Sequence, residues 1–344
     1  MAIEIIATGK GIPSRRVTND DLATQLDTSD EWIRSHTGIG SRHIADDSVA
    51  TSDLALEASK HALEMLLEKD PSLGGSMEAA AQSLDLIVVA TASGDYFGFP
   101  ATACVVQDKL GATKAGAMDV GAGCTGFIYA LDATAGMLSI GKNKKRALVL
   151  GAEILTRITD WSDRGSAVLF GDGAGAVILE KTDAPSSGPG KRGLFYSILG
   201  AEGSGAEHLI MERGGTRKPY VKGETIDVPP HIFMNGRAVY NFAVRVITDT
   251  IEKLLKAEGL TIDDVSRIVP HQANARIVQA AAKRLGIPEE KFFLNIEEYA
   301  NTSSASVPIA LDELNRSGKI QKGDLIMTLG FGAGLTYGGN LILW

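Results

Sequence analysis

The sequence predicts an α/β protein built from two similar halves that face each other. Apolar runs that suit buried strands, such as residues 84–91, alternate with amphipathic segments at helical spacing. The order strand, turn, helix, lysine-bearing turn, strand occupies residues 117–150 and recurs over residues 292–329. A glycine-rich segment follows each copy, at residues 171–179 and 338–344. We interpret this pattern as an internal duplication whose period is far longer than that of solenoid repeats.

Composition limits the classes of function. A chain of 344 residues that is 44% hydrophobic and 22% charged can bury a large core as one globular body of two fused domains. Its formal charge of −8 argues against nucleic acid or an acidic membrane surface as the main partner. The N-terminus lacks the pattern of a signal peptide, and we expect a cytoplasmic protein whose two cysteines are free thiols.

The first half, residues 1–185, begins with a strand over residues 2–8 and helices that start near Asn19 and Asp30. A helix over residues 51–67 should be capped by Thr51 or Ser52. Residues 71–83 are expected to be a loose extension. The central strand at 84–91 precedes a helix that carries Cys104, which we expect to pack in the core.

Cys124 is the first half's candidate nucleophile. A strand and small residues lead to it, and apolar residues at helical spacing follow, so the thiol should lie at a helix N-terminus, where the dipole favours thiolate. Flanking glycines let a substrate approach the sulfur, and a neighbouring amide could face an oxyanion. The alternative is an inert buried cysteine.

Two glycine patterns also suggest dinucleotide binding. Residues 121–126 fit G-x-G-x-x-G, but the motif lies outside the first βα unit, and Glu153, the acid that ends the next strand, comes later than the usual spacing of about twenty residues. Residues 171–176 fit as well, but they lead into a strand rather than the helix that a phosphate site needs. These glycines should instead let the strand pack tightly against the Cys124 loop.

The second half, residues 186–344, follows a seam rich in Pro, Ser, Gly and Lys at 183–192. Residues 194–199 read as a strand and the irregular segment 203–230 as a functional flap or cover. A helix should run from about Met234 to Glu258, with later strands at 266–270, 292–295 and 324–329 and a helix over 305–314.

Three polar side chains should converge on one site. His271 ends a strand, at the edge where α/β sheets bind ligands. Asn301 occupies the place of Cys124 in the duplicated half. With two similar halves packed face to face, Cys124, His271 and Asn301 all come from C-terminal strand ends, which favours the catalytic interpretation of the cysteine. Separately, Trp32 with the nearby cations Arg34 and His36 suits either a surface helix end or a purine ring with its phosphates.

Several motifs together resemble those of β-ketoacyl-acyl-carrier-protein synthase III, a family of condensing enzymes with the thiolase fold. The residues that carry the resemblance are 119–127 (DVGAGCTGF), 269–274 (VPHQAN) and 301–308 (NTSSASVP), with 28–33, 163–165, 171–176 and 331–334 in the expected order. The resemblance covers nearly the whole chain. It implies a thiolase-like fold of five layers, αβαβα, and a homodimer.

The resemblance also implies a reaction. Cys124 would take the acyl group of an acyl-CoA as a thioester, with the backbone amides of Cys124 and Ala333 as the oxyanion hole. His271 and Asn301 would hold the thioester carbonyl of malonyl-acyl-carrier protein and stabilise the enolate formed as carbon dioxide leaves. Coenzyme A and phosphopantetheine would act as substrate carriers, and the chemistry requires neither a metal nor a permanently bound cofactor.

Other positions match the family's binding residues. Trp32 and Arg164 match the pair that sandwiches the CoA adenine, and Asn274 a position at the mouth of the site. Phe331 matches a residue beside the nucleophile. Phe99 matches one that lines the acyl pocket across the dimer. The helix after His271 carries Arg276, Lys283 and Arg284, which suit either a carrier-protein docking face or an ordinary solvated helix face.

The chain departs from the family pattern in three places. His36 stands where many members have an arginine, Ala333 replaces the middle glycine of a triplet, and residues 71–83 are longer than typical. The acyl-CoA primer is left open. The alternatives to initiation of fatty-acid synthesis are a related synthase that primes a specialised, polyketide-type pathway, a cysteine-dependent thioester hydrolase, and the nicotinamide-binding interpretation.

Overall fold

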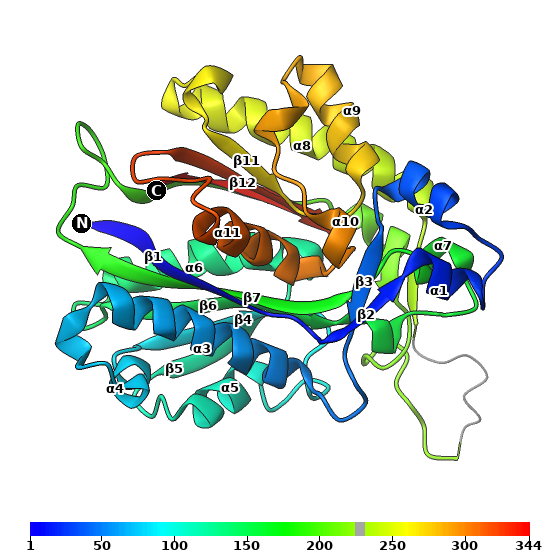
Figure 1. The fold of residues 1–344 in the computed structure, drawn as a ribbon, viewed down its shortest axis with the longest axis horizontal. Coiled ribbons are helices and arrows are strands. Elements are labelled where there is room, and N and C mark those ends of the chain that lie inside the picture. Colours follow the sequence, from blue (N-terminus) through cyan, green and yellow to red (C-terminus); the bar gives the residue numbers. More distant parts are fainter. Residues whose placement is uncertain (224–230) are drawn as a thin grey trace.

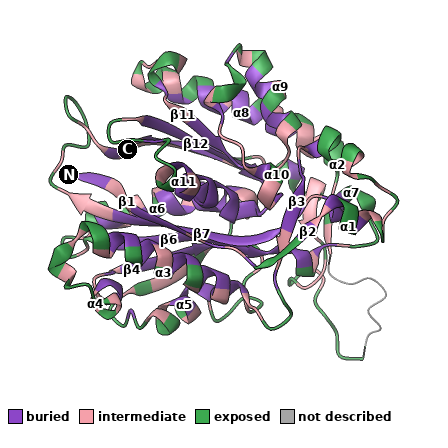
Figure 2. Cartoon of the chain, in the orientation of Figure 1, coloured by how far each residue is buried: buried purple, intermediate pink, exposed green. Residues whose placement is uncertain are grey.

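Five layers of helices and sheets form the molecule, as the sequence predicted (Figure 1). The computed structural model describes residues 1–223 and 231–344. Two helices lie between two sheets, and further helices cover the outer face of each sheet (Figure 1). Buried residues concentrate in the sheets and the two central helices, while the outer helices are exposed on one side (Figure 2).

The first sheet comes entirely from residues before the seam. Its strands lie in the order β1-β7-β6-β4-β5. Parallel pairs join β4 to β5 and to β6, and antiparallel pairs join β7 to β6 and to β1. The bounds are β1 (Ala2–Gly11), β4 (Leu86–Ala90), β5 (Gly116–Val120), β6 (Arg146–Ile154) and β7 (Asp172–Thr182).

The second sheet repeats this arrangement with the order β11-β12-β13-β8. Here too a parallel pair, β11 with β12, is followed by two antiparallel pairs. The bounds are β8 (Gly193–Ala201), β11 (Arg267–Pro270), β12 (Leu325–Gly332) and β13 (Thr336–Leu343). The strand expected at 292–295 is reduced to one parallel bridge between Phe292 and Ile268, in the position that β5 has in the first sheet. Matching strand orders confirm the duplicated architecture.

The helices divide into central and outer sets. The central pair consists of α6 (Gly126–Ile140) and α11 (Ser306–Arg316). The outer helices are α3 (Thr51–Lys69), α4 (Met77–Gln82) and α5 (Thr102–Leu110) on the first sheet and α8 (Gly236–Glu258) and α9 (Ala275–Leu285) on the second. Because α6 touches both sheets, Phe127, Ile128 and Leu131 are fully buried, as expected for a helix enclosed on all sides.

Short elements gather at one end of the two sheets (Figure 1). They are β2 (Arg15–Thr18), α1 (Asn19–Ala23), α2 (Asp30–Thr37), β3 (Ser41–Ile44), α7 (Arg164–Ala167), β9 (Leu209–Met211), β10 (Ile232–Met234) and α10 (Ile296–Tyr299). Ser29 caps α2 by accepting a hydrogen bond from the Trp32 amide, which fixes the start of the helix that carries Trp32.

Three local expectations were wrong. Residues 71–83 are an ordered 3₁₀ turn followed by α4, because Ala80 and Ala81 bury against the core. The residue that caps α3 is Ala50, whose amide donates to the Asp53 carboxylate. Cys104 is exposed, because α5 turns Ala103 and Val106 inward and leaves the intervening positions outside.

Each central helix starts against glycines of the opposite half. A Cβ on Gly151 would lie 2.1 Å from the Ser304 carbonyl oxygen, and a Cβ on Gly332 would lie 2.7 Å from the Cβ of Cys124. The prediction that the glycines of residues 171–176 pack against the Cys124 loop was wrong. A Cβ on Gly175 would lie 2.5 Å from the Ile309 amide nitrogen, so this strand packs on α11 and not on the Cys124 loop.

The register of the duplication also differs from the prediction. The 3₁₀ turns η2 (Gly123–Thr125) and η7 (Ser303–Ala305) immediately precede α6 and α11. Both start with a left-handed residue, Gly123 at φ 50° and Ser303 at φ 49°. Ser304 is thus the counterpart of Cys124, and Asn301 lies in the turn that leads into η7.

Gly151→Ala should destabilise the protein by about 1–3 kcal/mol, because its methyl group would press on the Ser304 carbonyl and overpack the contact between the halves. Gly136→Ala is the matched control: Gly136 lies in α6, and apart from the helix's own backbone no atom lies within 4 Å of its Cβ position, so alanine should be neutral or stabilising. Melting temperatures measure both effects. A Gly151→Ala protein as stable as the Gly136→Ala protein would contradict this account of the interface.

Candidate active site

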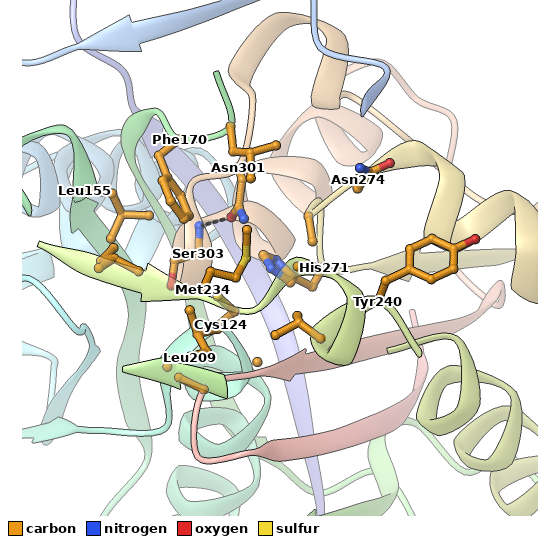
Figure 3. A pocket seen from close by; sticks show the side chains of 18 of the residues that line it. Cys124, Leu155, Phe170, Leu209, Met234, Tyr240, His271, Asn274, Asn301 and Ser303 are labelled. Carbon is orange, nitrogen blue, oxygen red and sulfur yellow. Dashed lines mark hydrogen bonds between the residues drawn. The ribbon is translucent and has the colours of Figure 1, made fainter. Parts of the chain in front are cut away.

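Cys124, His271 and Asn301 line one cavity of about 360 Å³ (Figure 3). Cys124 comes from η2 at the start of α6, His271 follows the end of β11, and Asn301 follows α10. The structure therefore brings together the three residues that the sequence predicted, from both halves of the duplication.

Cys124 is half-buried on the wall of this cavity. The predicted position beside a helix N-terminus is correct, but the predicted preference for thiolate is not, because burial raises the pKa of the Cys124 thiol to about 12. The negative charge of Glu153 raises this pKa further. The Cys124 thiol is therefore neutral at physiological pH and would have to lose its proton to act as a nucleophile.

His271 is a neutral imidazole with a defined hydrogen-bonding direction. Burial lowers its pKa to about 3. Its Nδ1 lies 2.7 Å from the Ser306 hydroxyl, which also accepts the Gln272 amide at 3.3 Å. Since Ser306 then has its own hydrogen to offer Nδ1, the arrangement assigns the proton of the ring to Nε2. Phe331 packs edge-on at 5.1 Å between ring centroids and holds the imidazole in place.

The side-chain amide of Asn301 is fixed by the turn that follows it. Its Oδ1 accepts the Ser303 amide at 2.9 Å, the dashed line in Figure 3. This bond commits the oxygen and makes the amide NH₂ the group available as a donor. His271 and Asn301 are thus two neutral donors on the cavity wall, a combination suited to a developing oxyanion.

The segment that contains Ala333 lies directly against the loop that carries Cys124. A Cβ on Gly123 would lie 3.1 Å from the Ala333 amide nitrogen, and Thr336 donates to the Ala333 carbonyl at 2.8 Å. Cys124 and Ala333 both line the cavity. The close approach of the two loops explains why Gly123 and Gly332 carry no side chain.

The predicted CoA residues lie together around the mouth of the cavity. Trp32 stacks on His36 at 4.4 Å between ring centroids, and the Arg164 guanidinium carbon lies 4.7 Å from the Trp32 ring centroid. Asn274 caps α9 and donates to the His36 carbonyl at 3.0 Å. Because Arg164 rests directly on the indole, an adenine can enter between them only if Arg164 moves aside.

The remaining predicted residues divide between cavity and surface. Phe331 lines the cavity beside His271. Phe99 is 86% exposed and is not among the residues that line this chain's own cavity, so its assignment to a partner's acyl pocket stays a prediction. Arg276, Lys283 and Arg284 are all exposed on α9 (Figure 2).

Most of the apolar lining was not predicted from the sequence. The strands β9 and β10 pair as a hairpin over the cavity and contribute Leu209, Met211 and Met234. These residues lie within or next to the predicted flap over 203–230, of which residues 224–230 lie outside the described part of the chain. The sequence feature that could have indicated this lining is the cluster of apolar residues on either side of the irregular segment 203–230.

Comparison with known proteins identifies the family of the chain. Residues 118–194 match the family model described as 3-oxoacyl-[acyl-carrier-protein (ACP)] synthase III, and residues 255–344 match its C-terminal model. The beta-ketoacyl-[acyl-carrier-protein] synthase III of Caldanaerobacter subterraneus is 47% identical, and the alignment covers 100% of this chain and 98% of that protein. The beta-ketoacyl-[acyl-carrier-protein] synthase III of Clostridium acetobutylicum is 42% identical, and the alignment covers 100% of this chain and 99% of that protein.

Two solved structures carry the same fold. The crystal structure of 3-oxoacyl-[acyl-carrier-protein] synthase III from Aquifex aeolicus aligns over 100% of both chains with a TM-score of 0.86 and 40% identity. The priming beta-ketosynthase of the R1128 polyketide pathway aligns with a TM-score of 0.86 and 34% identity, over 99% of this chain and 96% of that one.

The fold and the family matches define a thiolase-like condensing enzyme, a transferase. Within that class, the chain belongs to the β-ketoacyl-acyl-carrier-protein synthase III family. This membership favours the predicted condensation over the hydrolase and nicotinamide-binding alternatives. Among the described residues, no helix is both long and apolar enough to span a bilayer.

Proposed function

We propose that the protein condenses an acyl-CoA primer with malonyl-acyl-carrier protein and releases carbon dioxide, coenzyme A and a 3-oxoacyl-acyl-carrier protein, the step that initiates fatty-acid synthesis. The observation that carries the proposal is the meeting of Cys124, His271 and Asn301 in one cavity. A thiol and two neutral donors suit acyl transfer followed by enolate stabilisation.

The acyl transfer uses the first half. Cys124 attacks the thioester carbonyl of the acyl-CoA, and the amides of Cys124 and Ala333 stabilise the tetrahedral oxyanion. Coenzyme A leaves and the acyl group remains on the sulfur. The apolar side chains of the lining, Leu155, Phe170 and Leu209 among them, surround the acyl chain and limit access of water to the thioester.

The condensation uses the second half. The malonyl thioester carbonyl accepts hydrogen bonds from Nε2–H of His271 and from the Asn301 amide. As the carbon–carbon bond to the carboxylate breaks, the electron pair becomes an enolate that these donors stabilise. Its carbon attacks the acyl-enzyme and Cys124 leaves as the thiolate. No permanently bound cofactor takes part, because CoA and phosphopantetheine carry both substrates.

Single-turnover labelling tests the proposal. Incubation with radiolabelled acyl-CoA should label the protein stably, and addition of malonyl-acyl-carrier protein should release the label as a 3-oxoacyl product. Release as free acid would indicate a thioester hydrolase. A panel of acetyl-, branched- and longer-chain acyl-CoA then identifies the primer. A panel of carrier proteins from fatty-acid and polyketide pathways identifies the pathway.

Trp32→Ala should raise the KM for acyl-CoA about tenfold and change kcat little. The indole lies at the mouth of the cavity, so the energy it contributes is remote from the reacting atoms and nearly equal in ground and transition states. Steady-state kinetics with acyl-CoA as the varied substrate measures both constants. Trp161→Ala, another partly exposed tryptophan away from this cavity, is the control. An unchanged KM for Trp32→Ala would place the nucleotide elsewhere.

We further propose a cytoplasmic homodimer, with Phe99 of each chain reaching the acyl pocket of the other. The side chains of Tyr96, Phe97 and Phe99 are 58%, 71% and 86% exposed, which supports burial of this loop in an interface. The exposed cations Arg276, Lys283 and Arg284 would meet the acidic carrier protein. Light scattering tests the homodimer. Titration with carrier protein tests the docking face, by comparing the wild type with a variant in which Arg276, Lys283 and Arg284 are replaced by glutamate.

A further inference from the structure

Arg42 is a buried arginine without an acidic partner. It lies in β3, its side chain is 0% exposed, and none of the ion pairs that the described residues form includes it. Burial lowers the pKa of the Arg42 guanidinium to about 10, so the group keeps its charge at neutral pH. Arg146, the other buried arginine, is held instead by the carboxylates of Asp70 and Glu180. A buried charge without an opposite charge is costly, which indicates that Arg42 has a role besides stability.

The Arg42 guanidinium joins two segments that are far apart in the sequence. Its Nη1 donates to the side-chain oxygen of Asn19 at 2.9 Å, at the start of α1. Its Nη2 donates to the carbonyl of Val168 at 2.9 Å, at the end of α7. Its Nε has no hydrogen-bond partner within the described part of the chain. The planar fork thus anchors residue 168 to the N-terminal elements.

The segment after Val168 holds the backbone of Asn301. The Asn301 amide donates to the Leu169 carbonyl at 2.9 Å, and the Gly171 amide donates to the Asn301 carbonyl at 3.1 Å. Together these bonds form a parallel bridge between Phe170 and Asn301, which lie side by side in Figure 3. The first half therefore sets the position of this asparagine of the second half, through a segment that the buried guanidinium anchors.

The turn before Asn301 needs external support. Ala300 has φ 56° and ψ −155° and is 0% exposed. This region of backbone conformation is essentially restricted to glycine, and another residue stays there only where the surrounding structure fixes it. A Cβ on Gly171 would lie 2.6 Å from the Tyr299 carbonyl oxygen and 3.2 Å from the Cβ of Arg42, so the anchored segment packs directly on the strained turn.

The other end of the network reaches the mouth of the cavity. The side-chain nitrogen of Asn19 donates to the Asp30 carboxylate and to the Ile39 carbonyl, both at 2.8 Å. Asp30 is the first residue of α2, the helix that carries Trp32. Arg42 itself is not among the residues that line the cavity, so any effect on the reaction must pass through the groups that it holds.

We propose, on the basis of the function proposed above, that Arg42 is a positioning residue for Asn301. Its guanidinium holds residues 168–171 in place, and these keep the strained turn in the conformation that presents the Asn301 amide to the enolate. Acyl transfer depends less on this segment, because its oxyanion donors are the amides of Cys124 and Ala333. Loss of Arg42 should therefore impair the second half-reaction selectively.

The first test compares the two half-reactions in Arg42→Met, below its melting temperature and at saturating acyl-CoA. Carbon dioxide release from malonyl-acyl-carrier protein should fall about tenfold or more, the scale of a misplaced catalytic group. Labelling of Cys124 should stay within about threefold of wild type. Arg42→Lys keeps the charge but lacks the planar fork, so it should recover part of the decarboxylation.

Arg146→Met is the matched control. Arg146 is the first residue of β6, at the end of the strand opposite to the site, and its loss leaves two carboxylates without their partner. The variant should melt at a lower temperature, yet the ratio of its labelling and decarboxylation rates should match the wild type. A changed ratio in Arg146→Met equal to that in Arg42→Met would show that destabilisation alone explains the effect, and would overturn the proposal.

A double-mutant cycle tests whether Arg42 acts through Asn301. Added to Asn301→Ala, Arg42→Met should lower the residual decarboxylation no further, because the group that it positions is already gone. A second, additive loss would overturn the proposal, as would equal losses of labelling and decarboxylation in Arg42→Met alone. If Arg42→Met does not fold, the cycle is run with Arg42→Lys. A wild-type protein that neither labels nor decarboxylates would instead reject the proposed function.

Discussion

Replacing Cys124 with alanine should abolish covalent labelling from acyl-CoA while the protein keeps its fold. Alanine removes only the sulfur and retains the Cβ that lies close to the Gly332 backbone, so the contact between the halves is preserved. No described residue other than Cys104 could replace it as a thiol, and Cys104 is exposed on α5, which covers the opposite face of the first sheet. The measurement is mass spectrometry of the intact protein after incubation with acyl-CoA.

Cys104→Ala provides the matched control for this experiment. It removes the other thiol of the chain from a position outside the cavity, and it should label as fully as the wild type. The thermal transition of both variants should be close to that of the wild type. Label retained in Cys124→Ala, or lost in Cys104→Ala, would show that Cys124 is not the nucleophile.

The three central residues could be predicted from the sequence for a physical reason. Cys124 and His271 follow apolar strands, and the C-terminal ends of strands from two facing sheets meet at one edge of the molecule. This argument needs only the strand order and the duplication. It does not need the positions of individual side chains, which is why it also succeeded for Asn301 although the register of the duplication was three residues in error.

Features that depend on packing between distant segments could not be predicted. The high pKa of the Cys124 thiol comes from enclosure by loops of both halves, and the helix N-terminus alone suggested the opposite direction. Which face of α5 carries Cys104 depends on how that helix seats on the sheet. Ser304 and Glu153 are separated by 151 positions, so only the fold reveals that the Ser304 hydroxyl donates to the Glu153 carboxylate.

Replacing His271 or Asn301 with alanine should separate the two half-reactions. Neither side chain is required for Cys124 to take the acyl group, since the proposed oxyanion donors of that step are backbone amides. Both should be required for the enolate, because each supplies one neutral donor to it. We expect both variants to label Cys124 at rates near wild type, yet lose decarboxylation of malonyl-acyl-carrier protein by about 10²-fold or more, the scale of a lost oxyanion donor.

The low pKa of His271 adds a prediction about pH. With a pKa of about 3, the imidazole is neutral and its Nε2–H is available at every pH above roughly 4, so wild-type decarboxylation should show no histidine titration between pH 5 and 8.

A cysteine hydrolase predicts a different result for the His271→Ala variant. In a hydrolase the histidine activates the thiol, so His271→Ala abolishes labelling. The deciding measurement pairs acyl labelling of each variant with carbon dioxide release from malonyl-acyl-carrier protein; labelling lost while decarboxylation persists would overturn the condensing mechanism.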